Sequence, residues 1–482
     1  MTILANLING EWRSSRSDRG QEIHNPATGE VLAQVPFATP AEVEAAVTAA
    51  HEAFAEWRQV PPMARARVLF RFRELLEDAF EDLARLVTTE NGKTLDEARG
   101  EVRRAIENVE TAAGIPSLML GALAEDVSEG IDEEVVRQPL GVCTMFAPFN
   151  FPAMVPMWFV PYALAAGNTF VLKPSERTPL TQTRMAELLL EAGIPEGVYN
   201  LVHGGGDVAC QLIDDPRVRA VSFVGSTPVA REVYRRAAAA GKRVQCQGGA
   251  KNALVVMPDA DLRRTLPAIL SSAFGNAGQR CLAGSLVLAV GDAHRPVVEG
   301  LAEQAAALRL GNGLDERTQM GPVISPQAKA RIEAAIARGV DQGARLVLDG
   351  RGVRVPGGEG GNFIGPTLFD DVSPEMDLAR EEIFGPVLGV IPVPDLDAAI
   401  ATIEASRYGN MACIFTSSGR AAREFKYRVP AGNIGVNVGV AAPIAFMPFG
   451  GMKDSFFGDL HGQGQDAVDF FTHKKVVITR WF

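Results

Sequence analysis

Apolar residues recur at helical spacing in the N-terminal part of the chain, and the pattern changes near Gly141. Residues 41–57, 62–87 and 94–113 carry apolar side chains every three or four positions among Glu and Arg, which predicts amphipathic helices. From Gly141 onward, short β-rich runs alternate with helical runs. The predicted strands are 142–146, 169–172, 198–202 and 220–224, and the predicted helices are 180–192, 207–214 and 228–240.

Strands that alternate with helices imply parallel pairing through right-handed crossovers, so the sequence predicts an α/β fold with an open, doubly wound sheet. A second α/β series begins near Gln247 and runs to about residue 450. The tail from Lys474 to Phe482 is β-rich and ends on Trp481 and Phe482. We expect these apolar residues to be covered, either by the sheet edge of another subunit or by the tail's own domain.

Composition narrows the class of protein. A chain of 482 residues exceeds what one hydrophobic core supports, so two or three domains are expected. The net charge of −11 argues against nucleic acid or an anionic membrane as the main partner. Five scattered cysteines without a CxxC pair indicate neither a disulfide framework nor a zinc site, and they suit a cytoplasmic location.

One segment imitates a membrane span, because residues 139–172 contain no charged side chain. Four prolines interrupt it, whereas a transmembrane helix needs about 20 continuous apolar residues. We therefore predict a buried strand, a loop and a short helix here. The N-terminus lacks a basic region and a cleavage site, so no signal peptide is expected.

Cys281 is the strongest candidate for chemistry. It ends the stretch Asn276–Cys281, on a predicted loop between a helical run and the apolar run 285–290. Arg280 precedes it, and an arginine favours the thiolate form of a neighbouring cysteine, which is the nucleophile. The alternative is a small, inert buried thiol, as most free cysteines are.

Residues at three other places in the chain have both a functional and a structural interpretation. Lys173 and Glu176 follow a predicted strand, where doubly wound sheets bind ligands, and the glutamate could accept hydrogen bonds from ribose hydroxyls; a solvated turn is the alternative. Gly225 and Ser226 open a helix whose N-terminus would attract a pyrophosphate, with Ser226 as its cap. Asn150, inside the uncharged segment, could donate to an oxyanion or simply hold a loop.

Six motifs in a fixed order resemble the aldehyde dehydrogenase superfamily over nearly the whole chain, from about Leu7 to Phe482. They are Pro-Phe-Asn-Phe-Pro at 148–152, Lys-Pro-Ser-Glu at 173–176, Phe-Val-Gly-Ser at 223–226, Asn-Ala-Gly-Gln-Arg-Cys at 276–281, Glu-Glu-Ile-Phe-Gly-Pro at 381–386 and Pro-Phe-Gly-Gly at 448–451. The resemblance implies that Cys281 attacks an aldehyde, that hydride passes to NAD, and that a thioester remains on Cys281. It also implies that Asn150 and the Cys281 backbone N–H form the oxyanion hole. The positions that it assigns to NAD are Ala147, Phe149, Lys173, Glu176, Arg177, Gly225, Ser226, Gly248, Glu382 and Phe384.

The same resemblance implies two doubly wound α/β domains and a small β-rich oligomerisation arm. The NAD-binding domain would comprise residues 1–117 and 140–246, the catalytic domain 247–461, and the arm 118–139 and 462–482. A homo-oligomer is expected, as a tetramer built from two dimers.

Gln247 departs from the superfamily pattern. Hydrolytic members place a glutamate here as general base for the water that removes the acyl group, and an amide cannot accept that proton near neutral pH. A thiol such as coenzyme A ionises near pH ~8.5 and needs less help. The runs 243–252 and 455–461 are similar to the CoA-acylating methylmalonate-semialdehyde dehydrogenases, although Gln247, Gly248 and Gln279 differ from the residues expected there.

In those enzymes two arginines grip the substrate carboxylate, and the matching positions are Arg104 and Arg280. A guanidinium suits a carboxylate, whereas the alternative for Arg104 is a surface ion pair with Glu101 or Glu107. The implied reaction converts methylmalonate or malonate semialdehyde, NAD and CoA to propionyl-CoA or acetyl-CoA, CO2 and NADH. Two alternatives stay open: a hydrolytic NAD-dependent aldehyde dehydrogenase that gives a free acid, and a non-catalytic NAD-binding scaffold.

Overall fold

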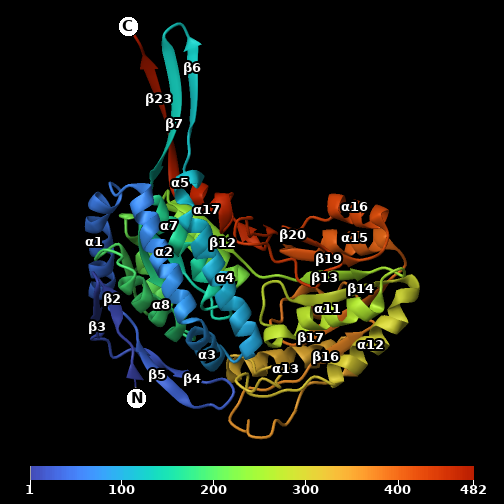
Figure 1. The fold of residues 1–482 in the computed structure, drawn as a ribbon. Helices are drawn as coiled ribbons and strands as arrows, with labels where there is room; N and C mark the ends of the chain where they lie inside the picture. The colour runs from blue at the N-terminus through green and yellow to red at the C-terminus, as the bar shows by residue number, and fades with distance from the viewer. Residues whose placement is uncertain (1) are drawn as a thin grey trace.

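Two large β-sheets organise the structure, a computed structural model that describes residues 2–482 (Figure 1). The eight strands of the first sheet lie in the order β22-β12-β11-β8-β9-β10-β2-β3. They are β22 (Phe456–Phe457), β12 (Arg243–Gln247), β11 (Val218–Val224), β8 (Val142–Phe146), β9 (Thr169–Lys173), β10 (Tyr199–Leu201), β2 (Asn6–Ile8) and β3 (Glu11–Arg13). The five strands from β12 to β10 are parallel, and the outer strands add antiparallel edges.

The parallel strands have the order expected of a dinucleotide-binding sheet. Taken along the chain, β8, β9 and β10 run to one side and β11 and β12 to the other, so the order reverses between β8 and β11. Ligands bind at such a reversal, outside the carboxyl ends of the strands. The predicted doubly wound fold is confirmed.

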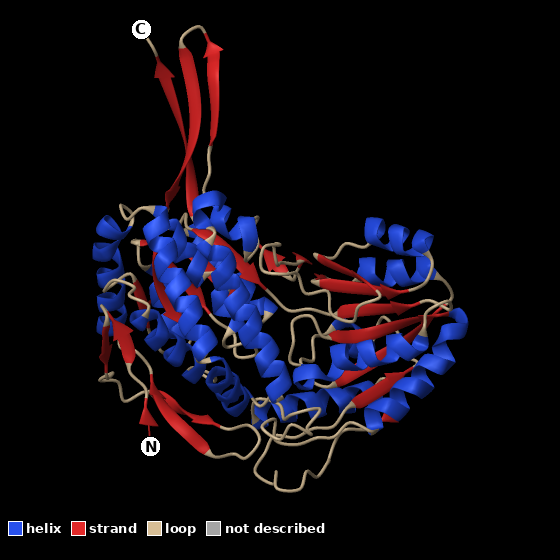
Figure 2. Ribbon diagram, in the orientation of Figure 1, coloured by secondary structure: helices blue, strands red, loops and turns tan. Residues whose placement is uncertain are grey.

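Helices cover both sheets, with strands between them (Figure 2). Around the first sheet lie α1 (Pro40–Trp57), α2 (Pro62–Asp78), α3 (Phe80–Asn91), α4 (Leu95–Ala113), α5 (Ile115–Leu118), α6 (Met154–Met157), α7 (Val160–Ala166), α8 (Leu180–Glu191), α9 (Gly206–Asp214), α10 (Thr227–Ala239) and α17 (Gly464–Phe470). The expected single helix over 62–87 is two helices, because the chain leaves helical geometry at Ala79. The uncharged segment 139–172 is a buried strand, a loop, two short helices and a second strand, and no helix within residues 2–482 is long and apolar enough to cross a membrane.

The second sheet has seven strands in the order β15-β16-β17-β14-β13-β19-β20, and all neighbours are parallel except β15 and β16. The strands are β15 (Arg345–Leu348), β16 (Thr367–Asp370), β17 (Val387–Val393), β14 (Gly284–Val290), β13 (Asn252–Val256), β19 (Met411–Phe415) and β20 (Asn433–Val436). Its helices are α11 (Leu262–Phe274), α12 (His294–Ala306), α13 (Pro326–Asp341), α14 (Asp377–Arg380), α15 (Leu396–Ala405) and α16 (Gly419–Arg428).

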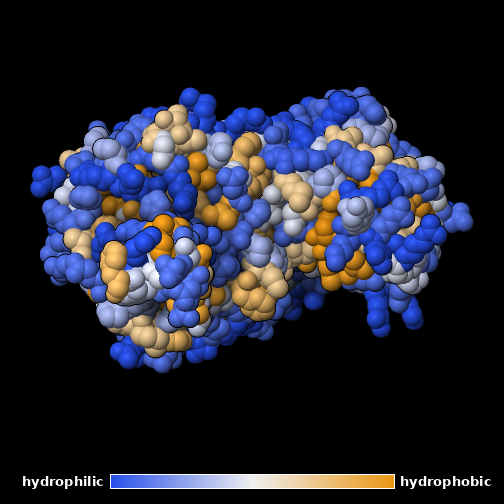
Figure 3. All heavy atoms as spheres, turned by 90° about the horizontal axis from the view of Figure 1, so that it is seen from above, coloured by the Kyte–Doolittle hydropathy of each residue, from blue (hydrophilic) through white to orange (hydrophobic). Residues whose placement is uncertain are grey.

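We call the first sheet with its helices the first lobe, and the second sheet with its helices the second lobe. A three-stranded sheet projects from the first lobe as an arm made of strands alone (Figures 1 and 2). It comprises β6 (Ala122–Ser128), β7 (Ile131–Pro139) and β23 (Thr472–Arg480), with β7 in the centre. Trp481 and Phe482 are exposed, so the expectation that the tail packs on its own domain is wrong. From the side that carries the arm, Figure 3 shows several hydrophobic patches among hydrophilic side chains.

Smaller sheets complete the fold. One joins β1 (Thr2–Ile3), β5 (Val31–Pro36) and β4 (Gly20–His24), and the other joins β18 (Tyr408–Gly409) and β21 (Met452–Lys453). The short strand β22 lies within the range predicted for the catalytic domain, yet it pairs with β12 of the first sheet. The chain thus crosses between the two lobes more than once, and a cavity lies where they meet.

Candidate active site

Cys281 lies on the loop between α11 and β14, as the sequence predicts. Its backbone carbonyl accepts hydrogen bonds from the side-chain amides of Asn252 (2.9 Å) and Asn410 (2.8 Å). These bonds fix the loop on the second sheet. The partly exposed cysteine lines a cavity of about 1050 Å³ between the two lobes.

The surroundings of the Cys281 thiol do not favour its thiolate form, in contrast to what the sequence suggests. Burial, together with the negative charge of Glu382, raises the pKa of the thiol to about 12, and the opposing effect of Arg280 is smaller. Arg280 forms an ion pair with Glu97 instead, since its Nη2 lies 2.7 Å from a carboxylate oxygen of Glu97. Arg280 thus lowers the pKa of the thiol, as expected from the sequence, but by less than burial and Glu382 raise it.

Asn150 lies beside the cysteine loop. Its side-chain Nδ2 donates to the backbone carbonyl of Gln279 (3.0 Å), two residues before Cys281. The backbone carbonyl of Asn150 accepts hydrogen bonds from Lys93 Nζ (2.7 Å) and Asn276 Nδ2 (3.3 Å). The buried side-chain amide is thus held against the loop that carries the thiol, and its second N–H is left available to another acceptor.

Arg104 and Arg280 line the same cavity as Cys281. Arg104 pairs with Glu107 (3.2 Å), one of the two alternatives suggested by the sequence, and its side chain stays 38% exposed. The expected partner Glu101 is instead buried with Lys93. Since one weak exposed pair leaves most of the Arg104 fork free, this guanidinium can still meet a carboxylate in the cavity.

Positions expected to bind NAD gather at the carboxyl ends of β8, β9 and β11. The backbone N–H of Ala147 donates to the carbonyl of Lys173 (3.0 Å), and Lys173 Nζ reaches a Glu176 oxygen (3.4 Å). Arg177 follows in the same turn, with its backbone N–H on Ser175 Oγ (3.2 Å). This cluster lies at the reversal in strand order where a dinucleotide would bind.

Ser226 is the N-terminal cap residue of α10, but its side chain makes no capping hydrogen bond, so that expectation is wrong. Its hydroxyl and the first N–H groups of α10 are the donors that a pyrophosphate requires. Gly225 leaves no room for a side chain, because a Cβ there would lie 2.5 Å from the Phe223 ring. A Cβ at Gly248 would likewise lie 2.7 Å from the Asp454 carbonyl.

Glu382 and Phe384 reach this region from the second lobe. Glu382 accepts a hydrogen bond from the Ala250 N–H (2.9 Å), and burial raises the pKa of its carboxyl to about 7 despite the nearby charges of Lys251 and Arg331. The rings of Phe149 and Phe384 meet edge to face, 5.8 Å apart. The region thus offers hydrogen-bond donors at the start of α10, two glycines where no side chain fits, and two aromatic rings. Together these features fit a nicotinamide dinucleotide that bridges the lobes.

Gln247 ends β12 and is buried. Its Nε2 donates to the carbonyl of Phe449 (3.2 Å), and Phe449 lines the cavity that contains Cys281. The Gln247 amide therefore lies behind a residue of the cavity wall and is hydrogen-bonded to it.

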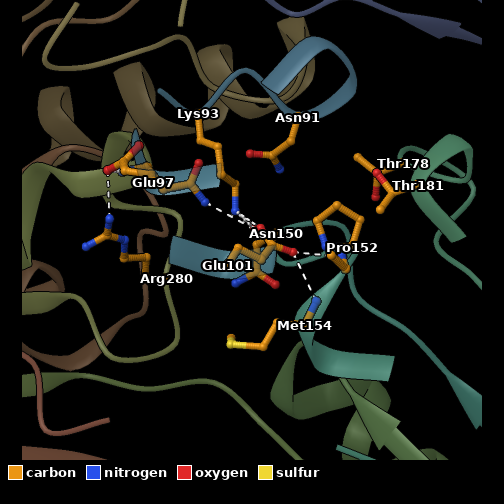
Figure 4. A network of polar contacts seen from close by, with 12 residues as sticks. Asn91, Lys93, Glu97, Glu101, Asn150, Pro152, Met154, Thr178, Thr181 and Arg280 are labelled. Carbon is orange, nitrogen blue, oxygen red and sulfur yellow. Dashed lines mark hydrogen bonds and ion pairs between the residues drawn. The ribbon is translucent and has the colours of Figure 1, made fainter. Parts of the chain in front are cut away.

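The sequence interpretation missed a buried polar network behind Asn150 (Figure 4). Lys93 and Glu101 form an ion pair with both side chains almost fully buried, and Glu101 also accepts from the backbone N–H groups of Ala153 (2.7 Å) and Met154 (3.2 Å). Burial lowers the pKa of Lys93, which the carboxylate of Glu101 opposes. The only signal in the sequence was the pair of glutamates four residues apart on the helix that also carries Arg104.

Comparison with known proteins supports the same assignment. A profile of the aldehyde dehydrogenase family matches residues 12–477. The chain is 52% identical over 477 residues to malonate-semialdehyde dehydrogenase 2 of Geobacillus thermodenitrificans, with 99% of each chain covered. It is 50% identical over 478 residues to the malonate-semialdehyde dehydrogenase of Halalkalibacterium halodurans, with 99% of this chain and 98% of the relative covered.

Solved structures match as closely. The methylmalonate-semialdehyde dehydrogenase of Oceanimonas doudoroffii superposes with a TM-score of 0.98 at 47% identity, over 100% of this chain and 99% of that one. A Sinorhizobium meliloti protein, named provisionally as a methylmalonate-semialdehyde dehydrogenase and complexed with NAD, gives 0.98 at 44% identity, over 100% and 98%. With the cysteine loop, the doubly wound sheet and the family profile in agreement, the chain belongs to the aldehyde dehydrogenase family.

Proposed function

We propose that the enzyme oxidises malonate or methylmalonate semialdehyde with NAD and passes the acyl group to coenzyme A. The observation that carries this proposal is the juxtaposition of Cys281, Arg104 and Arg280 on one cavity, with an amide, Gln247, where a general base would stand. The names of the relatives, malonate- and methylmalonate-semialdehyde dehydrogenases, support the substrate class.

In the proposed reaction the Cys281 sulfur attacks the aldehyde carbon after losing its proton. Asn150 and the Cys281 backbone N–H stabilise the oxyanion that forms. NAD, when bound, accepts the hydride that leaves the former aldehyde carbon. Lys173, Glu176, Arg177 and Ser226 hold the adenosine and pyrophosphate portions, whereas Phe149, Glu382 and Phe384 contact the nicotinamide portion.

While the acyl group is still bound to Cys281 as a thioester it loses CO2, and the remaining acyl group then passes to the thiol of coenzyme A. The carboxylate of the substrate lies β to the thioester carbonyl, so the C–C bond can break with the electron pair held by that carbonyl. The products are CO2 and an enolate, which takes up one proton. Thiol-to-thioester exchange returns the Cys281 sulfur and needs no base at Gln247, because a thiol ionises far more readily than water.

Product analysis tests this proposal directly. The purified enzyme is incubated with malonate semialdehyde and NAD, with and without coenzyme A, and NADH formation and products are measured. We expect steady turnover only with coenzyme A, and acetyl-CoA with CO2 as products. Equal turnover without coenzyme A, with a free acid as product, would refute the acylating reaction.

One observation favours hydrolysis as a second candidate. The carboxyl of Glu382, with its pKa raised to about 7, acts electrostatically on Cys281 and could serve as the base that Gln247 cannot be. The Glu382→Gln variant separates the two. It should lower the ratio of free acid to acyl-CoA more than 10-fold if Glu382 activates water, whereas an effect on the binding of NAD would lower both products alike and leave that ratio unchanged.

The carboxylate clamp is tested with Arg104→Ala. We expect the KM for malonate semialdehyde to rise about 10- to 100-fold, because a carboxylate loses a charge-assisted partner. The KM for propanal, which has no carboxylate, should change less than threefold, since it makes no such contact. Equal changes for both aldehydes would contradict the clamp. Glu107→Ala, which frees the same arginine, is the matched control and should not raise the KM for malonate semialdehyde.

A further inference from the structure

The carboxylate of Glu97 accepts hydrogen bonds from two segments beside the cavity. Glu97 occupies the third position of α4, and its Oε2 accepts from the backbone N–H of Thr94 (3.0 Å), which completes a capping box. Its Oε1 accepts from the backbone N–H of Asn276 (2.7 Å) and from Arg280 Nη2 (2.7 Å). One side chain thus ties the start of α4 to the loop that carries Cys281.

The backbone at the Asn276 contact is strained. Asn276 (φ 49, ψ 37) and Ala277 (φ 50, ψ 36) are consecutive left-handed residues, and neither is glycine. Both are fully buried, and the turn packs so tightly that a Cβ on Gly278 would lie 2.2 Å from the Gly385 carbonyl. Such a turn persists only where surrounding contacts impose it. Glu97 supplies one of them, at the backbone N–H of Asn276, which lies five residues before Cys281.

Glu97 also determines where Arg280 points. Arg280 Nη2 donates to Glu97, and Nη1 donates to the Ser271 carbonyl (3.2 Å). The pair is mostly buried, with 18% of the Arg280 and 15% of the Glu97 side chain exposed, so solvent screens it weakly. The other charges around the thiol and the pair are Glu382, Arg104 and the ion pair Lys93–Glu101, whose two charges cancel. The cavity is also lined by Asp96, Arg99, Asp315 and Glu316.

We propose that Glu97 is a positioning residue, which holds the left-handed turn before Cys281 and offsets the charge of Arg280 in the substrate cavity. The inference rests on Cys281 as the nucleophile but needs neither coenzyme A nor a particular semialdehyde. Two variants separate its parts. Glu97→Asp keeps the charge and withdraws the carboxylate by one methylene, and Glu97→Gln keeps the length and a capping oxygen but removes the charge.

The charge is tested by alkylation of the full-length enzyme without substrate. Rates with anionic iodoacetate and neutral iodoacetamide are compared at pH 8, and the adduct is mapped to Cys281 by peptide mass spectrometry. In Glu97→Gln we expect the iodoacetate-to-iodoacetamide rate ratio to rise about threefold to tenfold, because Arg280 is no longer offset. A purely structural role would move both rates together and leave the ratio unchanged.

Glu110→Gln is the matched control. It removes the same charge from the same helix, but Glu110 is 43% exposed and pairs with Arg73 away from the cavity. Its ratio should equal that of the wild type. An unchanged ratio in Glu97→Gln, or an equal rise in Glu110→Gln, would overturn the electrostatic part of the proposal.

The geometry is tested by rescue. Glu97→Asp should lower NADH formation about 10- to 100-fold, because a displacement of about 1 Å in the nucleophile loop suffices for such a loss. Adding Ala277→Gly should restore part of it, since glycine adopts the left-handed turn without strain. Unchanged turnover in Glu97→Asp, or no rescue by Ala277→Gly, would overturn this part; if Glu97→Asp fails to fold, the Glu97→Gln ratio decides alone. Failure of the proposed function would appear separately, as adducts and NADH formation that do not depend on Cys281.

Discussion

At the scale of single residues, Cys281 lies between charges of opposite sign. Glu382 raises the pKa of the thiol and Arg280 lowers it, while burial contributes most to the shift. The thiol therefore rests protonated near neutral pH. Attack on an aldehyde requires removal of that proton. The groups around Cys281 therefore affect the rate of attack, because they set the pKa of the thiol.

Cys281→Ser tests the assignment of the nucleophile. Serine has nearly the same shape but is a far weaker nucleophile without a base, so NADH formation should fall at least 1000-fold. Binding of NAD, measured by calorimetry, should change little because the predicted cofactor residues lie elsewhere. Cys413→Ser, in the buried strand β19, is a control that should retain NADH formation. Substantial NADH formation by Cys281→Ser would rule out the assignment.

Glu382 should make stability depend on pH in an unusual direction. Its carboxyl holds a proton up to a pKa of about 7 in the folded protein, whereas the unfolded chain releases it near 4.5. The folded state thus binds more protons between these values, and wild-type stability falls as pH rises through them. Glu382→Gln has no such proton, so it should gain about 1–3 kcal/mol relative to the wild type between pH 4 and pH 8.

Urea unfolding at pH 4, 6 and 8 measures this difference. Glu381→Gln is the matched control, because Glu381 is its neighbour and its side chain is 61% exposed. Its stability relative to the wild type should not vary with pH by more than a few tenths of a kcal/mol. A constant difference for Glu382→Gln across the three values would contradict the raised pKa.

At the scale of elements, α4 gathers the polar groups of the cavity on one face. Glu97, Glu101, Arg104 and Asn108 follow at spacings of four, three and four residues, which places them along one side of a helix, and all four line the cavity. Buried apolar residues such as Val102 and Ile106 occupy the side that packs against neighbouring helices. One helix thereby contributes to the nucleophile loop, the Asn150 loop and the substrate end of the cavity.

The buried ion pair behind this face should be costly to break. Lys93→Met leaves the Glu101 carboxylate buried without its counter-charge, and removing one partner of such a pair destabilises a protein by about 3–5 kcal/mol. Urea unfolding at pH 7 measures the loss. Arg99→Met, which breaks the more exposed pair between Arg99 of α4 and Glu81 of α3, should cost less than about 1 kcal/mol. Similar losses in both variants would contradict the special role of the buried pair.

The elements followed from local patterns more readily than the site did. Helical periodicity gives α1 and α4 to within a residue or two, because each has one long buried stripe. The break at Ala79 escaped this approach since apolar spacing continues from Leu76 to Leu83 across it. Cys281 and Asn150 came from motifs. The contacts of Glu101 with Ala153 and of Glu97 with Arg280 join residues 52 and 183 positions apart, which no local pattern encodes.

At the scale of the whole molecule, the arm exposes apolar side chains. Its outer strand β23 exposes Val476 (60%) and Ile478 (65%), and the chain beyond it exposes Trp481 and Phe482. A projecting strand edge with apolar side chains is a surface on which another chain can pair. We propose that it pairs with a second copy of this protein, as the building block of a larger homo-oligomer.

The double variant Val476→Lys and Ile478→Lys tests the arm. Both positions are exposed in the single chain, so folding should be preserved, whereas burial of two charges against a partner should dissociate the assembly. Light scattering after gel filtration gives the mass. Val340→Lys, an exposed apolar position on α13, is a control that should keep the wild-type mass. A double variant of unchanged mass would exclude the arm as an interface.

The strand β22 has a consequence for the order in which the protein is made. Phe456–Phe457 closes the edge of β12, the strand that leads into Gly248 and Gly249, although more than 200 residues separate the two strands. During synthesis from the N-terminus, the edge of β12 stays unpaired until that late segment has left the ribosome. The first sheet therefore cannot be completed before the second lobe has been translated, and a nascent chain stalled before residue 456 should expose this edge to proteolysis or to chaperones.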